Sequence, residues 1–135
     1  MIGIDTNILV RYLTNDDLEQ SNQVATLFAE YNERESSIYI NNIVLCELVW
    51  VLEKGYKYNT QQISTALKLI LQTPEFAFYN HKLLTQSVIE YERSSADLSD
   101  IIISLVNNNA GCTATYSFDK AAIKLGYFVQ PLNNK

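Results

Sequence analysis

The sequence predicts a single α/β layered domain with a mainly parallel sheet. Short runs of apolar and β-branched residues alternate along the chain with longer segments whose apolar residues recur at helical spacing. At 135 residues, of which 47% are hydrophobic, the chain is long enough to bury one core. This composition also argues against disorder.

The elements follow from local pattern and from the residues that begin or end each segment. Strands are expected at 1–4, 37–40, 76–79, 112–116 and 127–129. Helices are expected at 6–13, 43–52, 60–73, 81–93 and 118–125. A further helix follows a capping box formed by Asp16 and Glu19, and another begins near Leu98 and is closed by Gly111.

The bulk charge excludes one simple way of binding nucleic acid. The net charge is −5 and the isoelectric point is about 4.8, whereas electrostatic binding to a phosphate backbone needs a basic face. An acidic site still meets a phosphate when a divalent metal ion lies between them. The composition therefore leaves open a metal-dependent enzyme that acts on nucleic acid.

The sequence also sets expectations about compartment. It has neither an apolar stretch near the ~20 residues that span a bilayer nor the features of a signal peptide. Cys46 and Cys112 lie in apolar runs, and we expect two buried reduced thiols, although a disulfide between them stays open. A cytoplasmic protein is the expectation.

Two carboxylates of the first half stand where a ligand site is expected. Asp5 follows the first strand, at the edge where α/β sheets bind ligands, and it serves equally well as the N-cap of the next helix. Glu47 is the only charge in the apolar run 43–52, and residues at helical spacing on either side, Ile43 and Val51, are apolar. Because an unpaired buried charge is costly, Glu47 is expected to have a partner.

Three aspartates of the second half form a similar pattern. Asp97 is expected to cap the helix that begins near Leu98, and Asp100 lies in its first turn, close to the core side. Asp119 follows the predicted strand 112–116, where Ser117 is expected to cap the last helix. Each residue taken singly has a local explanation as a cap or a first-turn acid.

Taken together, the acids indicate a metal site. Carboxylates gathered in one place repel each other and are stable mainly around a bound cation. Oxygen ligands without histidine or cysteine suit Mg²⁺ or Mn²⁺, which can orient a phosphodiester for hydrolysis. The sequence offers little support for other kinds of active site. The only histidine is His81, expected on the surface, and the four glycines form no phosphate-binding loop.

Four segments carry a resemblance to a known family. They read Ile-Asp-Thr-Asn-Ile-Leu-Val-Arg-Tyr-Leu at 4–13, Glu-Leu-Val-Trp-Val-Leu at 47–52, Ala-Asp-Leu-Ser-Asp at 96–100 and Tyr-Ser-Phe-Asp at 116–119. In order and spacing this set resembles the PIN domain, and most of all the VapC toxins of type II toxin–antitoxin pairs. The resemblance covers essentially the whole chain and implies one PIN domain over 1–135, a three-layer α/β/α sandwich.

The resemblance also implies a function and a set of site residues. The chain would be a Mg²⁺-dependent endoribonuclease, with Mn²⁺ as the alternative ion, that hydrolyses RNA phosphodiester bonds. The four acids of the family match Asp5, Glu47, Asp100 and Asp119, which would bind the metal and carry catalysis.

The motifs depart from the family pattern in two places. The third motif usually reads Asp-Phe-x-Asp; here Leu98 replaces the phenylalanine, and Asp97 matches an additional acid seen in part of the family. In the fourth motif Ser117 replaces a common threonine and keeps the hydroxyl. Thr6 and Ser117 would orient the metal-binding carboxylates, and Asp97 would either support them or serve as a helix cap.

RNA would be contacted by basic residues near the site in sequence, namely Arg11, Lys54 and Lys57. Tyr56 and Tyr58 either stack on bases or pack against the protein. The implied partners are the RNA substrate, a cognate antitoxin and a second copy of the chain, with no membrane.

Two other functions stay open. One is a PIN nuclease that is not a toxin and acts in RNA maturation. The other is a catalytically silent protein-interaction module in which the acids serve only as caps.

Overall fold

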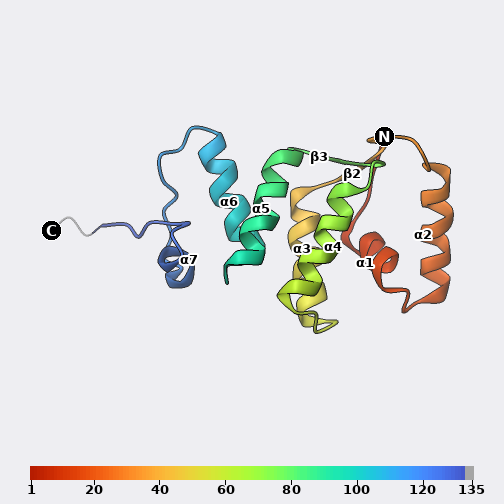
Figure 1. Cartoon of the computed structure of the whole chain (residues 1–135), viewed down its shortest axis with the longest axis horizontal. Coiled ribbons are helices and arrows are strands. Elements are labelled where there is room, and N and C mark those ends of the chain that lie inside the picture. Colours follow the sequence, from red (N-terminus) through yellow and green to blue (C-terminus); the bar gives the residue numbers. More distant parts are fainter. Residues whose placement is uncertain (133–135) are drawn as a thin grey trace. The chain divides into compact units, whose positions relative to one another are not determined.

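A computed structural model describes residues 1–132 of the chain. The chain divides into two compact units, Met1–His81 and the segment from Lys82 onward. The first unit holds a parallel sheet and its connecting helices, and the second is mainly helical (Figure 1). The expectation of an α/β protein with a parallel sheet is confirmed.

The sheet of the first unit has the order β1-β2-β3, and both pairs of neighbours are parallel. Strand β1 is Ile2–Gly3, β2 is Ile38–Ile40 and β3 is Phe76–Phe78. The three strands lie where the sequence predicts them, although each is shorter than expected. In parallel strands the carboxyl ends share one edge, so the segment after Gly3 begins at the edge where α/β sheets bind ligands.

Two pairs of helices connect these strands. Between β1 and β2 lie α1 (Thr6–Thr14) and α2 (Leu18–Glu30); between β2 and β3 lie α3 (Asn42–Lys54) and α4 (Thr60–Gln72). Helix α1 packs against α2 and α3, and α3 packs against α4. The pairing of α1 with α3 brings side chains that are about 40 positions apart in sequence onto one surface of this unit.

The caps of these helices follow local chemistry with one correction. The N-cap of α2 is Asp17, whose side chain accepts a hydrogen bond from the backbone N–H of Gln20 at 3.0 Å. The predicted capping box of Asp16 and Glu19 is therefore wrong by one residue. The carboxylate of Asp16 is instead bound to the guanidinium of Arg11, 3.0 Å away.

Helix α3 is buried on one face and open on the other. Its core face is formed by buried side chains, namely Val44, Leu45, Leu48, Val49 and Leu52. On the opposite face Ile43 is 67% exposed, Glu47 is half-buried and Trp50 is 42% exposed. The sequence indicates a buried helix; the structure buries only one face of α3, and the open face holds Ile43 and Trp50 beside Glu47.

The second unit contains α5 (His81–Arg93), α6 (Leu98–Asn109) and α7 (Lys120–Lys124). The expected strands 112–116 and 127–129 reduce to one parallel bridge between Tyr116 and Val129. The N–H of Val129 donates to the carbonyl oxygen of Thr115 at 2.8 Å. The turn after α6 is made by Gly111, whose φ of 101° is a conformation that favours glycine.

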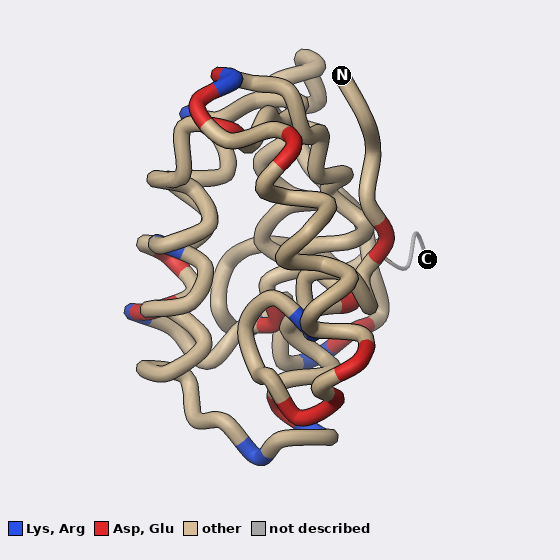
Figure 2. The backbone as a smooth tube through the Cα atoms, turned by 90° about the vertical axis from the view of Figure 1, so that its right-hand side faces the viewer, with Lys and Arg blue, Asp and Glu red and all other residues tan. Residues whose placement is uncertain are grey.

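The cysteines and the charges complete the description. Cys46 and Cys112 form no disulfide; Cys46 is half-buried and Cys112 is exposed, so the expectation that both are buried was wrong. No helix among residues 1–132 has the length and apolar character needed to cross a membrane. Acidic and basic positions are interspersed along the described backbone (Figure 2).

Candidate active site

Asp5 stands at the junction of β1 and α1. Its backbone is extended, as an N-cap requires, and its carboxylate accepts a hydrogen bond from the N–H of Thr6 at 2.7 Å. The side chain remains exposed. Because only one cap bond is made, the capping role leaves acceptor capacity on the carboxylate. Asp5 is thus both a cap and a side chain presented to solvent at the edge of the sheet.

Glu47 reaches the same place from α3. The hydroxyl of Thr6 donates a hydrogen bond of 2.6 Å to its Oε1 atom, and Thr6 itself is only 8% exposed. The partner that a half-buried glutamate requires is therefore a residue next to Asp5. Asp5, Thr6 and Glu47 line one cavity of about 520 Å³ in the first unit.

Other walls of this cavity come from α1 and α3 and from the segment that follows α3. They are formed by Asn7, Val10, Arg11, Trp50, Val51 and Tyr56. The sequence pointed to Arg11 but not to Trp50, because only the packing of α1 on α3 shows which part of the apolar run 43–52 faces the acids. The signal available beforehand was spacing, since Trp50 lies three positions after Glu47 and shares its face of the helix.

Arg11 is held in place by three side chains. Its Nε donates to Gln20 at 2.6 Å, and its Nη1 donates to Asp16 at 3.0 Å and to the hydroxyl of Tyr56 at 3.4 Å. The Tyr56 hydroxyl donates in turn to Asp16 at 2.6 Å. Hydrogen bonds from Tyr56 and Thr14, together with the charge of Arg11, lower the pKa of Asp16.

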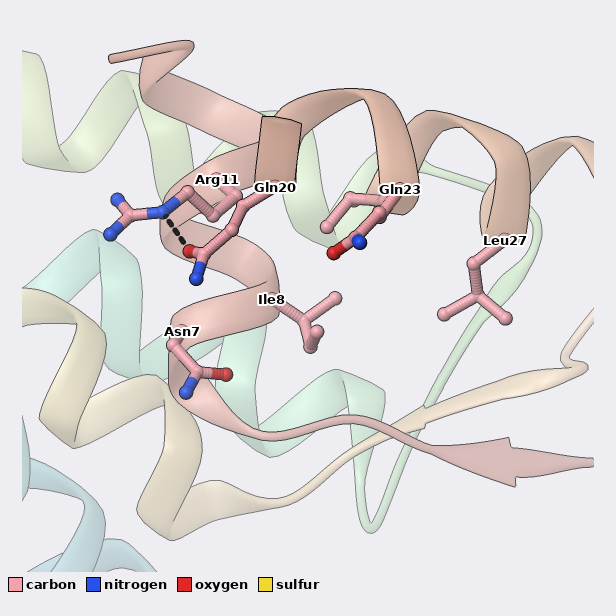
Figure 3. Close-up of a pocket in the computed structure, with 7 residues that line it drawn as sticks. Asn7, Ile8, Arg11, Gln20, Gln23 and Leu27 are labelled. Atoms are coloured by element: carbon pink, nitrogen blue, oxygen red, sulfur yellow. Dashed lines mark hydrogen bonds between the residues drawn. The ribbon is translucent and has the colours of Figure 1, made fainter. Parts of the chain in front are cut away.

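Figure 3 shows this guanidinium beside a second cavity, which lies between α1 and α2. That cavity measures about 290 Å³ and is lined by Asn7, Ile8, Arg11, Gln20, Gln23, Val24 and Leu27. Arg11 therefore borders both cavities. No carboxylate lines the smaller one.

The acids of the second unit have a different setting. Asp97 is the N-cap of α6, as expected, but its side chain makes no capping hydrogen bond. Asp100 lies in the first turn of α6 and is half-buried. Burial raises the pKa of Asp100, and the charges of Asp119 and Asp97 raise it further. These three carboxylates therefore interact electrostatically within this unit.

Asp119, rather than Ser117, is the N-cap of α7, which corrects the predicted cap. Its Oδ1 atom accepts hydrogen bonds from the N–H groups of Ala121 and Ala122, at 3.1 and 3.2 Å. The hydroxyl of Ser117 accepts from the N–H of Asp119 at 3.0 Å. Ser117 thus holds the backbone of Asp119, whereas Thr6 binds a carboxylate directly.

The predicted site residues accordingly fall into two groups. Asp5, Thr6, Glu47 and Arg11 are gathered in the first unit; Asp97, Asp100, Ser117 and Asp119 belong to the second. Within either unit, taken over residues 1–132, no three acidic, histidine or cysteine side chains are close enough to hold a metal by themselves.

Four further residues singled out in the sequence, two lysines, a tyrosine and a histidine, do not line the acidic cavity. Lys54 and Lys57 are exposed near the end of α3 and do not line the acidic cavity. Tyr58 packs edge-on against Tyr56, at 6.2 Å between ring centroids. His81, predicted at the surface, is exposed, and its Nε2 lies 2.7 Å from the carbonyl oxygen of Leu71.

The first unit is thus a parallel α/β unit with the acidic side chains of Asp5 and Glu47 around a cavity at the carboxyl edge of its sheet. The family model described as the PIN domain matches residues 2–125. The chain belongs to the PIN domain family.

Two known proteins are similar to the chain over nearly its full length. The VapC ribonuclease of Aquifex aeolicus (strain VF5) is 23% identical over 124 residues, which cover 92% of this chain and 91% of the relative. The crystal structure of Mycobacterium tuberculosis VapC20, described as a sarcin-ricin loop cleaving toxin, is 18% identical. It covers 97% of this chain and 98% of its own, with a TM-score of 0.43.

Proposed function

We propose that the protein is a metal-dependent endoribonuclease and the toxin of a toxin–antitoxin pair. The observation that carries the proposal is the group of Asp5, Thr6 and Glu47 around one cavity in a chain of the PIN domain family. Similarity to a VapC ribonuclease over nearly the full chain supports RNA as the substrate and an antitoxin as partner. Homodimerisation remains part of the proposal.

The donor chemistry fits Mg²⁺ or Mn²⁺. Asp5 and Glu47 offer carboxylate oxygens in a solvent-accessible cavity, and hard divalent ions prefer such ligands. Asp100 and Asp119 offer two more, and the raised pKa of Asp100 is relieved when a cation is near. We propose that all four acids serve one reaction.

The chain's own residues then have distinct tasks. Thr6 fixes the orientation of Glu47 through its hydrogen bond, and the N–H of Thr6 fixes Asp5. The chemistry that a bound Mg²⁺ supplies is neutralisation of charge on the phosphate and a water of lowered pKa. Arg11 is held by Asp16, and the two N–H groups of its Nη2 atom have no partner within residues 1–132. In this proposal these N–H groups bind a substrate phosphate.

The basic residues outside the cavity have a weaker role in this proposal. Lys54 and Lys57 are exposed and attract the RNA backbone without fixing it. In the second unit, Ser117 supports Asp119 through the backbone N–H of that residue, and Asp97 adds negative charge beside Asp100.

The test is cleavage of total RNA by the purified protein with Mg²⁺, with Mn²⁺ and with a chelator. Asp5→Asn is expected to abolish metal-dependent cleavage and to leave the fold intact, because asparagine is as good an N-cap as aspartate. Glu47→Gln is expected to lower the rate at least ~100-fold, on the scale of losing a preorganised electrostatic group. Its matched control is Glu53→Gln on the same helix, which is exposed and lies outside the cavity.

Full activity of the Asp5→Asn variant contradicts the proposal. Calorimetric titration with Mg²⁺ and Mn²⁺ separates it from a protein-interaction module, which binds neither ion at these acids. Sequencing of RNA ends after induction separates a toxin, which cuts at defined sites in mature RNA, from a nuclease of RNA maturation.

A further inference from the structure

Trp50 is the only tryptophan of the chain, and it is 42% exposed. It lies on α3 three residues after Glu47, about 4.5 Å further along the helix axis. It lines the same cavity as Asp5 and Glu47. The largest aromatic surface of the protein is therefore in part presented to solvent beside the acids.

A single exposed apolar residue is common on protein surfaces and needs no explanation. Trp50 differs from Ile43 on the same helix, which is more exposed but lies outside the cavity. Within residues 1–132, the indole N–H has no hydrogen-bond partner and the ring has no aromatic contact. Both the face and the polar edge of this side chain are thus available to a ligand.

The cavity walls are complementary to the parts of a nucleotide. Val10 and Val51 add apolar surface beside the indole, Arg11 supplies a fixed positive charge, and Asp5 and Glu47 supply oxygen ligands. The tyrosine nearest to this surface cannot turn freely to stack, because the hydroxyl of Tyr56 is bound to Asp16. Trp50 is the aromatic group of this cavity that carries no such tether.

We propose that Trp50 is the platform on which an unpaired nucleobase stacks next to the phosphodiester that is cleaved. The proposal rests on the proposed ribonuclease function of this cavity. Every base has a π face, so stacking on an indole tolerates sequence but requires that the base be free of its neighbours. The substrate expected from this contact is RNA with at least one unstacked base at the cut, which a continuous duplex does not offer.

The sole tryptophan reports on this contact directly. In the Asp5→Asn variant, which does not cut its ligand, a short single-stranded RNA is expected to quench tryptophan fluorescence in a saturable way. The same sequence annealed to its complement is expected to leave the emission unchanged. Fluorescence anisotropy of labelled RNA measures binding in parallel, independently of the tryptophan signal.

Substitutions of Trp50 distinguish the contribution of an aromatic ring to RNA binding from that of apolar size alone. In the same Asp5→Asn background, Trp50→Leu is expected to weaken binding of single-stranded RNA about tenfold, within the range of base–aromatic stacking. Trp50→Phe keeps a ring and is expected to restore most of the affinity. The matched control Ile43→Ala removes an exposed apolar side chain from the same helix and is expected to change nothing.

Three outcomes overturn the stacking role. One is RNA binding by anisotropy with unchanged tryptophan emission, and another is unchanged affinity in Trp50→Leu. In both cases, metal-dependent cleavage by the unsubstituted protein leaves the ribonuclease proposal standing. The third is an emission that depends on protein concentration and not on RNA, which assigns Trp50 to an interface between two copies. If the unsubstituted protein neither binds nor cleaves any RNA, both proposals fail.

Discussion

Asp5 and Glu47 in the first unit both bind Thr6, whereas Asp100 in the second unit is half-buried beside Asp119 and Asp97. The hydrogen bonds of Thr6 fix the orientation of the first pair. At Asp100, desolvation and the neighbouring negative charges destabilise the charged form of the carboxylate. Because burial and the neighbouring charges disfavour ionised Asp100, we expect a bound cation to stabilise the charged form of this carboxylate.

The largest expected effect concerns the hydrogen bond that holds Glu47. Thr6→Val removes the hydroxyl at nearly constant shape, and we expect metal affinity to fall 10- to 100-fold, the usual cost of losing a group that orients a ligand. Isothermal titration with Mn²⁺ measures this. Thr6→Ser keeps the hydroxyl and should restore affinity; equal affinities in all three proteins would show that Glu47 needs no such support.

A smaller effect is expected when Arg11 loses its charge partner. Asp16→Asn removes the charge partner of Arg11, and because the pair is partly exposed, we expect KM for RNA to rise up to about fivefold with kcat unchanged. The control is Glu19→Gln, a neutralised acid nearby on α2. Since the pKa of Asp16 is lowered, the pairing persists in mild acid and is lost only as pH falls through that lowered pKa. A fall in kcat alone would contradict this role.

The smallest effect concerns stability in the second unit. Because the folded-state pKa of Asp100 is raised above 3.8, its ionisation costs stability, and the cost sets in as pH rises through the folded pKa. Asp100→Asn should therefore raise the stability of the metal-free protein at neutral pH, by less than about 1 kcal/mol after solvent screening. The gain should vanish in acid.

Thermal unfolding with a chelator at several pH values tests this expectation. Glu53→Gln serves as the control, because it also removes one negative charge from this acidic protein but lies on an exposed surface. A destabilised Asp100→Asn at neutral pH would mean that the protein stabilises the ionised carboxylate of Asp100, which would contradict this expectation.

Much of the first unit could be predicted from local pattern. The strands, the helices and the position of Asp5 after β1 follow from alternation, apolar spacing and turn residues, which depend on neighbours in sequence. The same local rules failed where two nearby residues could each serve as the N-cap of a helix. Asp17 rather than Asp16 caps α2, and Asp119 rather than Ser117 caps α7.

The later strands mark a second limit of local pattern. β-rich composition predicted strands at 112–116 and 127–129, and the structure forms one bridge between Tyr116 and Val129. Strand formation needs a paired neighbour over several residues, so composition alone does not set the length of a ladder.

By itself the sequence determined the class of fold, the chain's place in its family and the acids worth testing, because these depend on residue order and spacing. Only the tertiary structure decided which side chains the acids meet. The hydrogen bond from Thr6 to Glu47 spans 41 positions, and it exists because α1 packs on α3. The same packing leaves one face of an apolar helix open and turns Trp50 toward the acids, which no local pattern in residues 43–52 distinguishes from burial.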